Sequence, residues 1–295
     1  MSMAVPSASP ASQSFFKTAC SGLATLYTLT VRQHLHGKRW MVIGTLFSLP
    51  AGLAILVRAT SPDVPPTGLE FLLAMMLLPQ LLLPLVALLY ASGIIDDEQE
   101  EQTITYLLIR PLPKWAIYVV KLLATITTTV VLTAIFTTAT FAAVYVGADA
   151  PFEEWGIRLP KTAGIHCLAV AAYCCLFGLA SLLTKRSLVV GVIYIAVIEG
   201  LLANLPFGIR LITVIYYARM IAYRTLSYVI ATPHGEENMA AEAWQLDLQS
   251  DPELLTHPPL STCFLVLVVA SVFCTALGAW ICSEREFHVK TPENV

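Results

Sequence analysis

The chain has 295 residues, of which 57% are hydrophobic and only 13% charged, and its mean hydropathy is +0.72. Soluble domains carry about 25% charged residues, so this composition excludes an ordinary soluble protein. The net charge of −3, without any tract of basic residues, excludes nucleic acid as a partner. The seven cysteines lack the spacing of a zinc site and predict neither a metal centre nor a disulfide framework.

The amino-terminal segment is expected outside the bilayer. Residues 1–14 are rich in Ser, Ala and Pro and carry no charge, which predicts a disordered tail. Within residues 15–39, apolar side chains recur every three or four positions, at Phe16, Cys20, Leu23, Tyr27, Val31 and Leu35. This periodicity predicts an amphipathic helix that lies along the membrane interface. An ordinary surface helix packed on the membrane bundle is the alternative.

Residues 40–295 contain six apolar runs, and crossing roughly 30 Å of hydrocarbon takes about 20 apolar residues. The runs are 40–57, 71–95, 116–146, 164–183, 188–206 and 260–281. The sequence therefore predicts an all-α membrane protein with six transmembrane helices. The third run is longer than a bilayer requires, which indicates a tilted or projecting helix. Pro79 and Pro84 in the second run predict a kink whose freed carbonyls need other partners.

The distribution of Lys and Arg sets the expected orientation. The side that holds both termini carries eleven of the seventeen basic residues, and basic residues accumulate on the cytoplasmic side of membrane proteins. We therefore expect a multi-pass protein of the cell (inner) membrane with both termini in the cytoplasm. The outer loop then covers about 207–259. Its first part, 210–230, is rich in Tyr and Arg and predicts short helices at the headgroup level or a partial re-entry. Its second part, 232–259, is acidic and is expected to be exposed to solvent.

The segment between the second and third runs has the composition of a docking element. Five carboxylates follow the second run: Asp96, Asp97, Glu98, Glu100 and Glu101. Ile104, Leu107 and Leu108 then form an apolar patch on a short helix, which Pro111 and Pro113 end. Such a helix is suited to docking into a groove on a partner. A solvated acidic turn is the alternative, and the residues alone favour neither interpretation.

This segment resembles the signature of ABC-2 type transporter permeases. The residues that fit the signature are Gly93, Ile95, Glu98, Glu100, Thr103, Leu107, Leu108, Arg110, Pro111 and Lys121, whereas Gln102 replaces the usual Gly. The resemblance implies a short cytoplasmic coupling helix that docks on an ATP-hydrolysing subunit. The coupling residues would be Glu98, Glu100, Glu101, Thr103, Ile104, Leu107, Leu108, Arg110 and Pro111.

The resemblance also implies an assembly. The chain has no G-x-x-x-x-G-K-[ST] loop, so ATP and Mg are expected in a partner ATPase subunit, and the chain itself is expected not to be an enzyme. Six spans suit a half-transporter, which implies a homodimer in the lipid bilayer with two ABC ATPase subunits. Its function would be export of an unknown substrate. The alternative is a module that moves no substrate and passes ATPase-driven motion to an extracytoplasmic protein through the outer loop.

Two features inside the predicted spans are candidates for a substrate path. Glu199 is the only acidic residue within a predicted span, where a charge costs at least about 2.5–3.5 kcal/mol. It either lies on the substrate path or lies near the outer headgroups and pairs with an arginine such as Arg210. Thr129 and Thr133 belong to a threonine stripe on the third span. The stripe either packs with its hydroxyls bonded to the preceding turn or lines a polar path.

Overall fold

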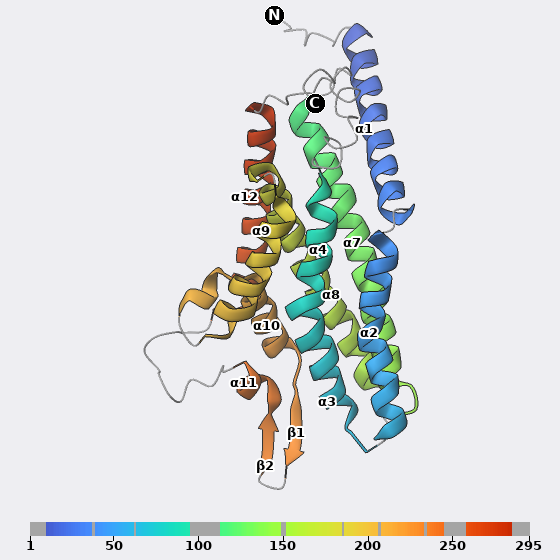
Figure 1. Cartoon of the computed structure of the whole chain (residues 1–295), viewed down its shortest axis with the longest axis vertical. Helices are drawn as coiled ribbons and strands as arrows, with labels where there is room; N and C mark the ends of the chain where they lie inside the picture. Colours follow the sequence, from blue (N-terminus) through green and yellow to red (C-terminus); the bar gives the residue numbers. More distant parts are fainter. Residues whose placement is uncertain are drawn as a thin grey trace, which may run out of the picture.

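The structure, a computed structural model, is a bundle of long helices with a small group of short elements at one end (Figure 1). It describes residues 10–36, 39–61, 63–94, 113–148, 152–184, 186–205, 208–232, 235–244 and 258–284. Within these ranges, six helices are long and apolar enough to cross a membrane, which confirms the predicted number. The chain is therefore an all-α membrane protein.

Four of the six spans are single helices: α2 (Arg39–Thr60), α7 (Lys114–Tyr145), α8 (Phe152–Leu183) and α12 (Leu260–Glu284). The second span consists of α3 (Pro66–Glu70), a π-helix (Phe71–Leu82) and α4 (Leu83–Ala91). The fifth consists of α9 (Ser187–Ile193), a π-helix (Tyr194–Leu201) and a 3-10 turn (Leu202–Asn204). The two composite spans thus interrupt regular α-geometry inside the bundle.

The long third span is confirmed, and the fourth is longer than its apolar run. Both α7 and α8 have 32 residues, a length of roughly 48 Å at the α-helical rise per residue. The prediction for the fourth span began at residue 164, after the charged residues Arg158 and Lys161. The helix includes both because their side chains find hydrogen-bond partners in the segment 225–227.

The second span is irregular around the two prolines from which a kink is predicted. Pro79 lies inside the π-helix, and Pro84 lies in the first turn of α4, which continues directly from it. In a π-helix the amide of residue 79 would bond to the carbonyl of Ala74, and proline has no amide to do so. The imidazole of His166 lies close to that carbonyl. The geometry of the second span thus changes from π to α between the two prolines.

Small residues let the spans approach closely. A methyl group at Gly191 of α9 would lie 2.1 Å from a methyl carbon of Leu88 in α4, and one at Gly278 of α12 would lie 2.4 Å from the hydroxyl of Tyr118 in α7. A methyl group at either position would force the facing side chain of Leu88 or Tyr118 to shift, and small residues are usual where membrane helices pack closely. The second span is therefore held against the fifth, and the third against the sixth.

Helix α1 (Pro10–His36) differs from the expectation in two ways. It begins within the stretch expected to be a disordered tail, with Pro10 at the first helical position, where proline is tolerated. It also runs along the long axis of the molecule beside α7, whereas a helix flat on the membrane would cross that axis (Figure 1). Among the side chains that are described from residue 20 on, the buried ones are Leu26, Thr30 and His34, each one residue away from the predicted apolar stripe. The structure thus favours the alternative, a helix packed on the bundle.

We call residues 208–244 the cap. It contains a 3-10 helix (Gly208–Ile212), α10 (Val214–Thr225), strands β1 (Val229–Thr232) and β2 (Gly235–Asn238), and α11 (Met239–Ala243). The two strands form an antiparallel hairpin in which Val229 pairs with Asn238. Helix α10 packs against α8 and α12, in agreement with the expected short helices. The solvent exposure predicted after residue 232 is wrong for Ala240 and Trp244, which are buried against the bundle.

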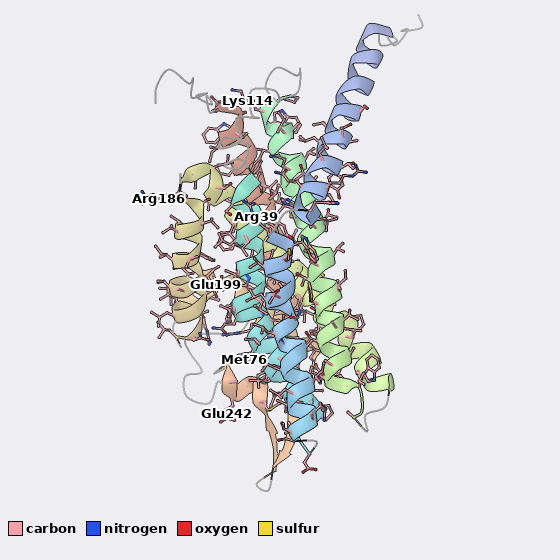
Figure 2. The ribbon with its side chains drawn as sticks, turned by 45° about the vertical axis from the view of Figure 1, so that its right-hand side comes forward. Arg39, Met76, Lys114, Arg186, Glu199 and Glu242 are labelled. Carbon is pink, nitrogen blue, oxygen red and sulfur yellow. The ribbon has the colours of Figure 1, made fainter. Side chains whose placement is uncertain are left out.

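The cap and three basic residues of the predicted cytoplasmic side lie toward opposite ends of the bundle. Arg39, Lys114 and Arg186 lie toward one end, Glu242 of the cap lies at the other, and Glu199 lies between them (Figure 2). This arrangement agrees with the sequence-based prediction that these three basic residues and the outer loop lie on opposite sides of the membrane.

Candidate functional site

The predicted coupling segment joins the second and third spans. Its candidate residues Glu98, Glu100, Glu101, Thr103, Ile104, Leu107, Leu108, Arg110 and Pro111 lie outside the residues that the structure describes. Both flanks are described, because the second span is placed up to Ile94 and α7 begins at Lys114. Two residues of the signature, Gly93 and Lys121, lie in these flanks, and both are buried.

Lys121 holds the end of the second span. Its ammonium group donates a hydrogen bond of 2.9 Å to the carbonyl oxygen of Ile94, and only 4% of the residue is exposed. Carbonyls at the carboxyl end of a helix lack partners within the helix and carry partial negative charge, so a cation there is stabilising. Since Lys121 lies two turns into α7, this bond fixes where the chain leaves the second span relative to the third.

The end of α1 contacts both spans that flank the coupling segment. The Nε2 atom of His34 lies 3.1 Å from the hydroxyl of Thr125, one turn beyond Lys121 in α7. The hydroxyl of Tyr90 in α4 donates to the carbonyl of His34, and the two rings meet edge to face with their centroids 4.8 Å apart. Helix α1 thus bridges the second and third spans close to their junction.

The threonine stripe of α7 is buried, and its hydroxyl groups differ in their hydrogen-bond partners. The hydroxyl of Thr129 donates to the carbonyl one turn earlier and lies 3.3 Å from the sulfur of Cys174, as the packing interpretation predicts. Thr137 bonds to Nδ1 of His166. The hydroxyl of Thr133, between them, has no hydrogen-bond partner among the described residues. The bonds of Thr129 agree with the packing interpretation, and a path-lining role for Thr129 and Thr133 stays a prediction.

Glu199 is fully buried and binds the amino terminus of α10. One carboxylate oxygen accepts hydrogen bonds from the amide of Val214 at 3.0 Å and from the hydroxyl of Tyr194 at 2.9 Å. The other accepts from the amide of Ile215 at 3.1 Å. The first amides of a helix have no partners within it and form the positive end of its dipole, so they stabilise a carboxylate. The described bonds of Glu199 thus go to α10 and to Tyr194 rather than to Arg210.

Arg219 of α10 lies in the same buried region and joins three elements. One guanidinium nitrogen donates to the amide oxygen of Asn204 at 3.0 Å, and another donates to the amide oxygen of Gln80 in the second span. The guanidinium carbon also lies 5.9 Å from the centre of the Trp244 ring, which is within the range of a cation–π contact. Burial lowers the pKa of Arg219 to about 10, while the charge of Glu199 acts in the opposite sense. Arg219 thus keeps its charge at neutral pH.

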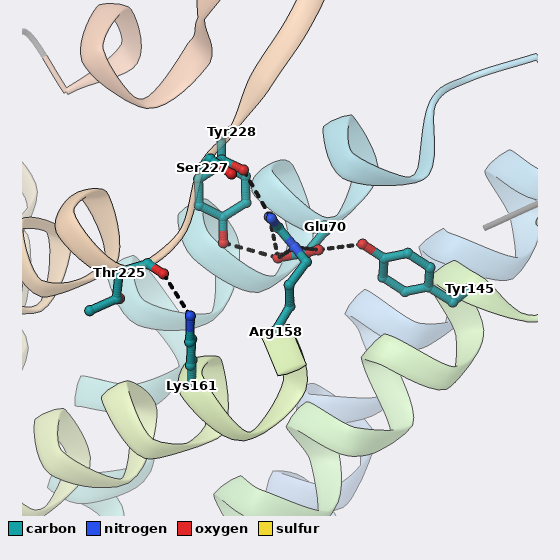
Figure 3. A network of polar contacts seen from close by, with 7 residues as sticks. All are labelled: Glu70, Tyr145, Arg158, Lys161, Thr225, Ser227 and Tyr228. Atoms are coloured by element: carbon teal, nitrogen blue, oxygen red, sulfur yellow. Dashed lines mark hydrogen bonds and ion pairs between the residues drawn. The ribbon is translucent and has the colours of Figure 1, made fainter. Parts of the chain in front are cut away.

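A second buried cluster, the clasp, is centred on Glu70 (Figure 3). The guanidinium of Arg158 in α8 donates to both carboxylate oxygens of Glu70, with distances of 2.8 and 2.9 Å for the two shortest bonds. The hydroxyls of Tyr145 in α7 and Tyr228 in the cap also donate to this carboxylate. A further nitrogen of Arg158 donates to the carbonyl of Ser227. The clasp therefore connects the second, third and fourth spans with the cap.

Two features of the clasp bear on its electrostatics. Burial raises the pKa of Tyr228 above its usual value, and the adjacent charge of Glu70 raises it further. Lys161, one turn beyond Arg158, is exposed and donates a single hydrogen bond to the carbonyl of Thr225 (Figure 3). The two cations on one face of α8 thus differ, because Arg158 neutralises a buried carboxylate and Lys161 does not.

The sequence did not predict these contacts for Glu70, Arg158 or Arg219. Glu70 directly precedes the second apolar run, and the two arginines lie outside the predicted spans. The one sequence feature that could have indicated a buried polar contact was Gln80, a polar residue between two prolines inside an apolar span. The structure also places no group of three or more His, Cys, Asp or Glu side chains that could hold a metal ion within its described ranges.

The chain matches a known protein family. Residues 34–204 match the family model described as ABC-2 family transporter protein, which covers more than half of the chain. The match begins at the end of α1, includes the first five spans and ends at Asn204, before the cap. No curated protein matches the chain.

Proposed function

The chain belongs to the ABC-2 family of transporter proteins, and we propose that it is the permease subunit of an ABC transporter that exports a substrate across the inner membrane. The observation that carries this proposal is the family match, which includes the acidic segment between the second and third spans. Members of this family are in general non-catalytic membrane subunits. ATP and Mg would therefore bind to a separate ABC ATPase.

Coupling to the ATPase would occur through residues 98–111. In this proposal Leu107 and Leu108 are the apolar anchors, and burying each leucine in a groove contributes roughly 1.5–3 kcal/mol. The hydrogen bond between Lys121 and Ile94 supports such a role, because it fixes the point from which the coupling segment starts. A force applied to the segment would then act on the second and third spans together.

The proposed assembly is a homodimer of this chain with two ATPase subunits. The ATPases would bind at the end that carries Lys114 and Arg186, with both termini in the cytoplasm and the cap outside (Figure 2). Labelling of single cysteines in intact cells with an impermeant reagent tests the orientation. Asn238 of the cap should react after substitution by cysteine, and Ser283 should not. The reverse pattern would refute the orientation.

The second candidate function is transmission of ATPase-driven motion to an extracytoplasmic protein. The observation that favours it is the set of bonds between the cap and the second span. Because the second span leads to the coupling segment, these bonds connect the cap to the span on which the ATPase would act. A substrate path along Thr129, Thr133 and Glu199 belongs to the export proposal alone. Substrate-stimulated ATP hydrolysis in vesicles supports export, and stimulation by an extracytoplasmic protein alone supports transmission.

Copurification with the ATPase tests the claim that both proposals share, namely that the chain binds an ABC ATPase. The tagged chain should retain an ABC ATPase, and the double variant Leu107→Ala with Leu108→Ala should lose it. The matched control is Leu72→Ala, because Leu72 is an exposed leucine of the second span far in sequence from the coupling segment. Retention of the ATPase by a double variant that reaches the membrane in normal amounts would refute the docking residues. Hydrolysis of ATP by the purified chain alone would refute the proposal that a separate subunit hydrolyses ATP.

A further inference from the structure

The π-helical part of the second span contacts the cap at successive turns. The ring of Phe71 packs on Tyr228 and Trp244, with centroids 5.1 and 5.3 Å away. The indole nitrogen of Trp244 lies 3.0 Å from the sulfur of Met76, and Met76 lies between Glu199 and Glu242, in the half of the bundle nearer the cap (Figure 2). These contacts hold the residue before β1 and the residue after α11 against the second span.

Gln80 makes the deepest of these contacts. Its amide oxygen accepts a hydrogen bond from Arg219 of α10, and a bond to a charged donor is about twice as strong as one between neutral groups. Glu199 holds the amino terminus of the same helix. Helix α10 is therefore fixed to the second span by Arg219 and to the fifth span by its first turn.

The cap is also bound to α8. Arg158 donates to the carbonyl of Ser227, and Lys161 donates to the carbonyl of Thr225. The cap thus lies across the second and fourth spans. If the second span moves relative to α8, the contacts of the cap to both cannot be kept unless the cap moves or opens.

The second span has a built-in place for such a movement. Its cytoplasmic half, α4, is α-helical and leads to Ile94, which Lys121 holds. The other half is a π-helix, and the change of geometry lies between Pro79 and Pro84. Prolines and π-helical segments are the usual sites of helix kinks, and π-segments are frequent at functional sites. Gln80 lies within this junction.

We propose that the second span is the element that connects the coupling end to the cap, and that the hydrogen bond donated by Arg219 to Gln80 transmits its movement to α10. This inference rests on the proposed function, because it takes the ATPase as the source of the movement. It assigns Gln80 and Arg219 the role of positioning residues. The family match ends before the cap, so the inference rests on the contacts of this chain alone.

Amide hydrogen exchange on the purified complex with its ATPase tests the inference. Exchange is measured with and without a non-hydrolysable ATP analogue and Mg, in segments 95–112, 214–225 and 239–244. In the wild type the analogue should change exchange in all three. In Gln80→Leu, which keeps the volume and removes the acceptor, the change in the two cap segments should be lost while the change in 95–112 remains.

Two further variants make the result specific. Gln80→Glu keeps an acceptor for Arg219 and should restore the response of the cap. Leu81→Ala changes the neighbouring exposed residue and should leave the response as in the wild type. The inference fails if the analogue changes 95–112 without changing the cap in the wild type, or if Gln80→Leu keeps the cap response. It also fails if Gln80→Glu behaves like Gln80→Leu. No response to the analogue in any segment would instead refute the proposed ATPase coupling, and the inference with it.

Discussion

Replacing Arg158 by alanine should destabilise the protein severely, because it leaves the buried carboxylate of Glu70 without its cation. Glu70 is fully buried, and Arg158 is 14% exposed. Removing one partner of a buried ion pair costs about 3–5 kcal/mol. The hydroxyls of Tyr145 and Tyr228 remain as donors to the carboxylate, so we expect the lower end of this range. The free energy of unfolding in mixed detergent micelles, followed by tryptophan fluorescence, measures the loss.

Lys161→Ala is the matched control, since Lys161 is an exposed cation of the same helix that donates one hydrogen bond to the cap. Surface substitutions of this kind usually change stability by no more than about 0.5 kcal/mol. Adding Glu70→Gln to Arg158→Ala should recover part of the loss, because it removes the uncompensated charge. The reasoning is refuted if Arg158→Ala costs no more than Lys161→Ala, or if Glu70→Gln deepens the loss.

Three further substitutions test the other buried contacts. Lys121→Met should release the carbonyl of Ile94 and cost about 1.5–3 kcal/mol, the usual contribution of a hydrogen bond to a charged group; an unchanged free energy of unfolding would contradict this. Glu199→Gln places an amide group against the backbone amides of α10, so hydrogen exchange at Ile215 should become faster, whereas equal rates would contradict the capping role. Tyr228 has a raised pKa in the folded state, so its contribution to stability is present below the unfolded pKa of about 10 and is lost as the pH rises above it. Tyr228→Phe should therefore weaken the alkaline loss of stability, and an unchanged pH profile between 9 and 11, roughly the range around that pKa, would exclude this origin.

The sequence alone determined the number and approximate position of the six spans. Burying a backbone in lipid requires long, nearly uncharged helices, and such runs are visible without any knowledge of packing. The family was also accessible, because the residues around Glu98 to Lys121 follow a local signature. The irregularity of the second span followed from Pro79 and Pro84, since proline removes an amide wherever it occurs.

Only the tertiary structure decided what the polar residues do. The sequence could not choose partners for Glu199, because the amides of Val214 and Ile215 come from a segment that folds back from the loop after the fifth span. Nor could it pair Glu70 with Arg158 or Gln80 with Arg219, which are 88 and 139 residues apart. A buried charge needs a partner, and composition and periodicity predict that such a partner exists without identifying it. Which helices meet, and therefore which charges are compensated, depends on the packing of the whole bundle and its cap.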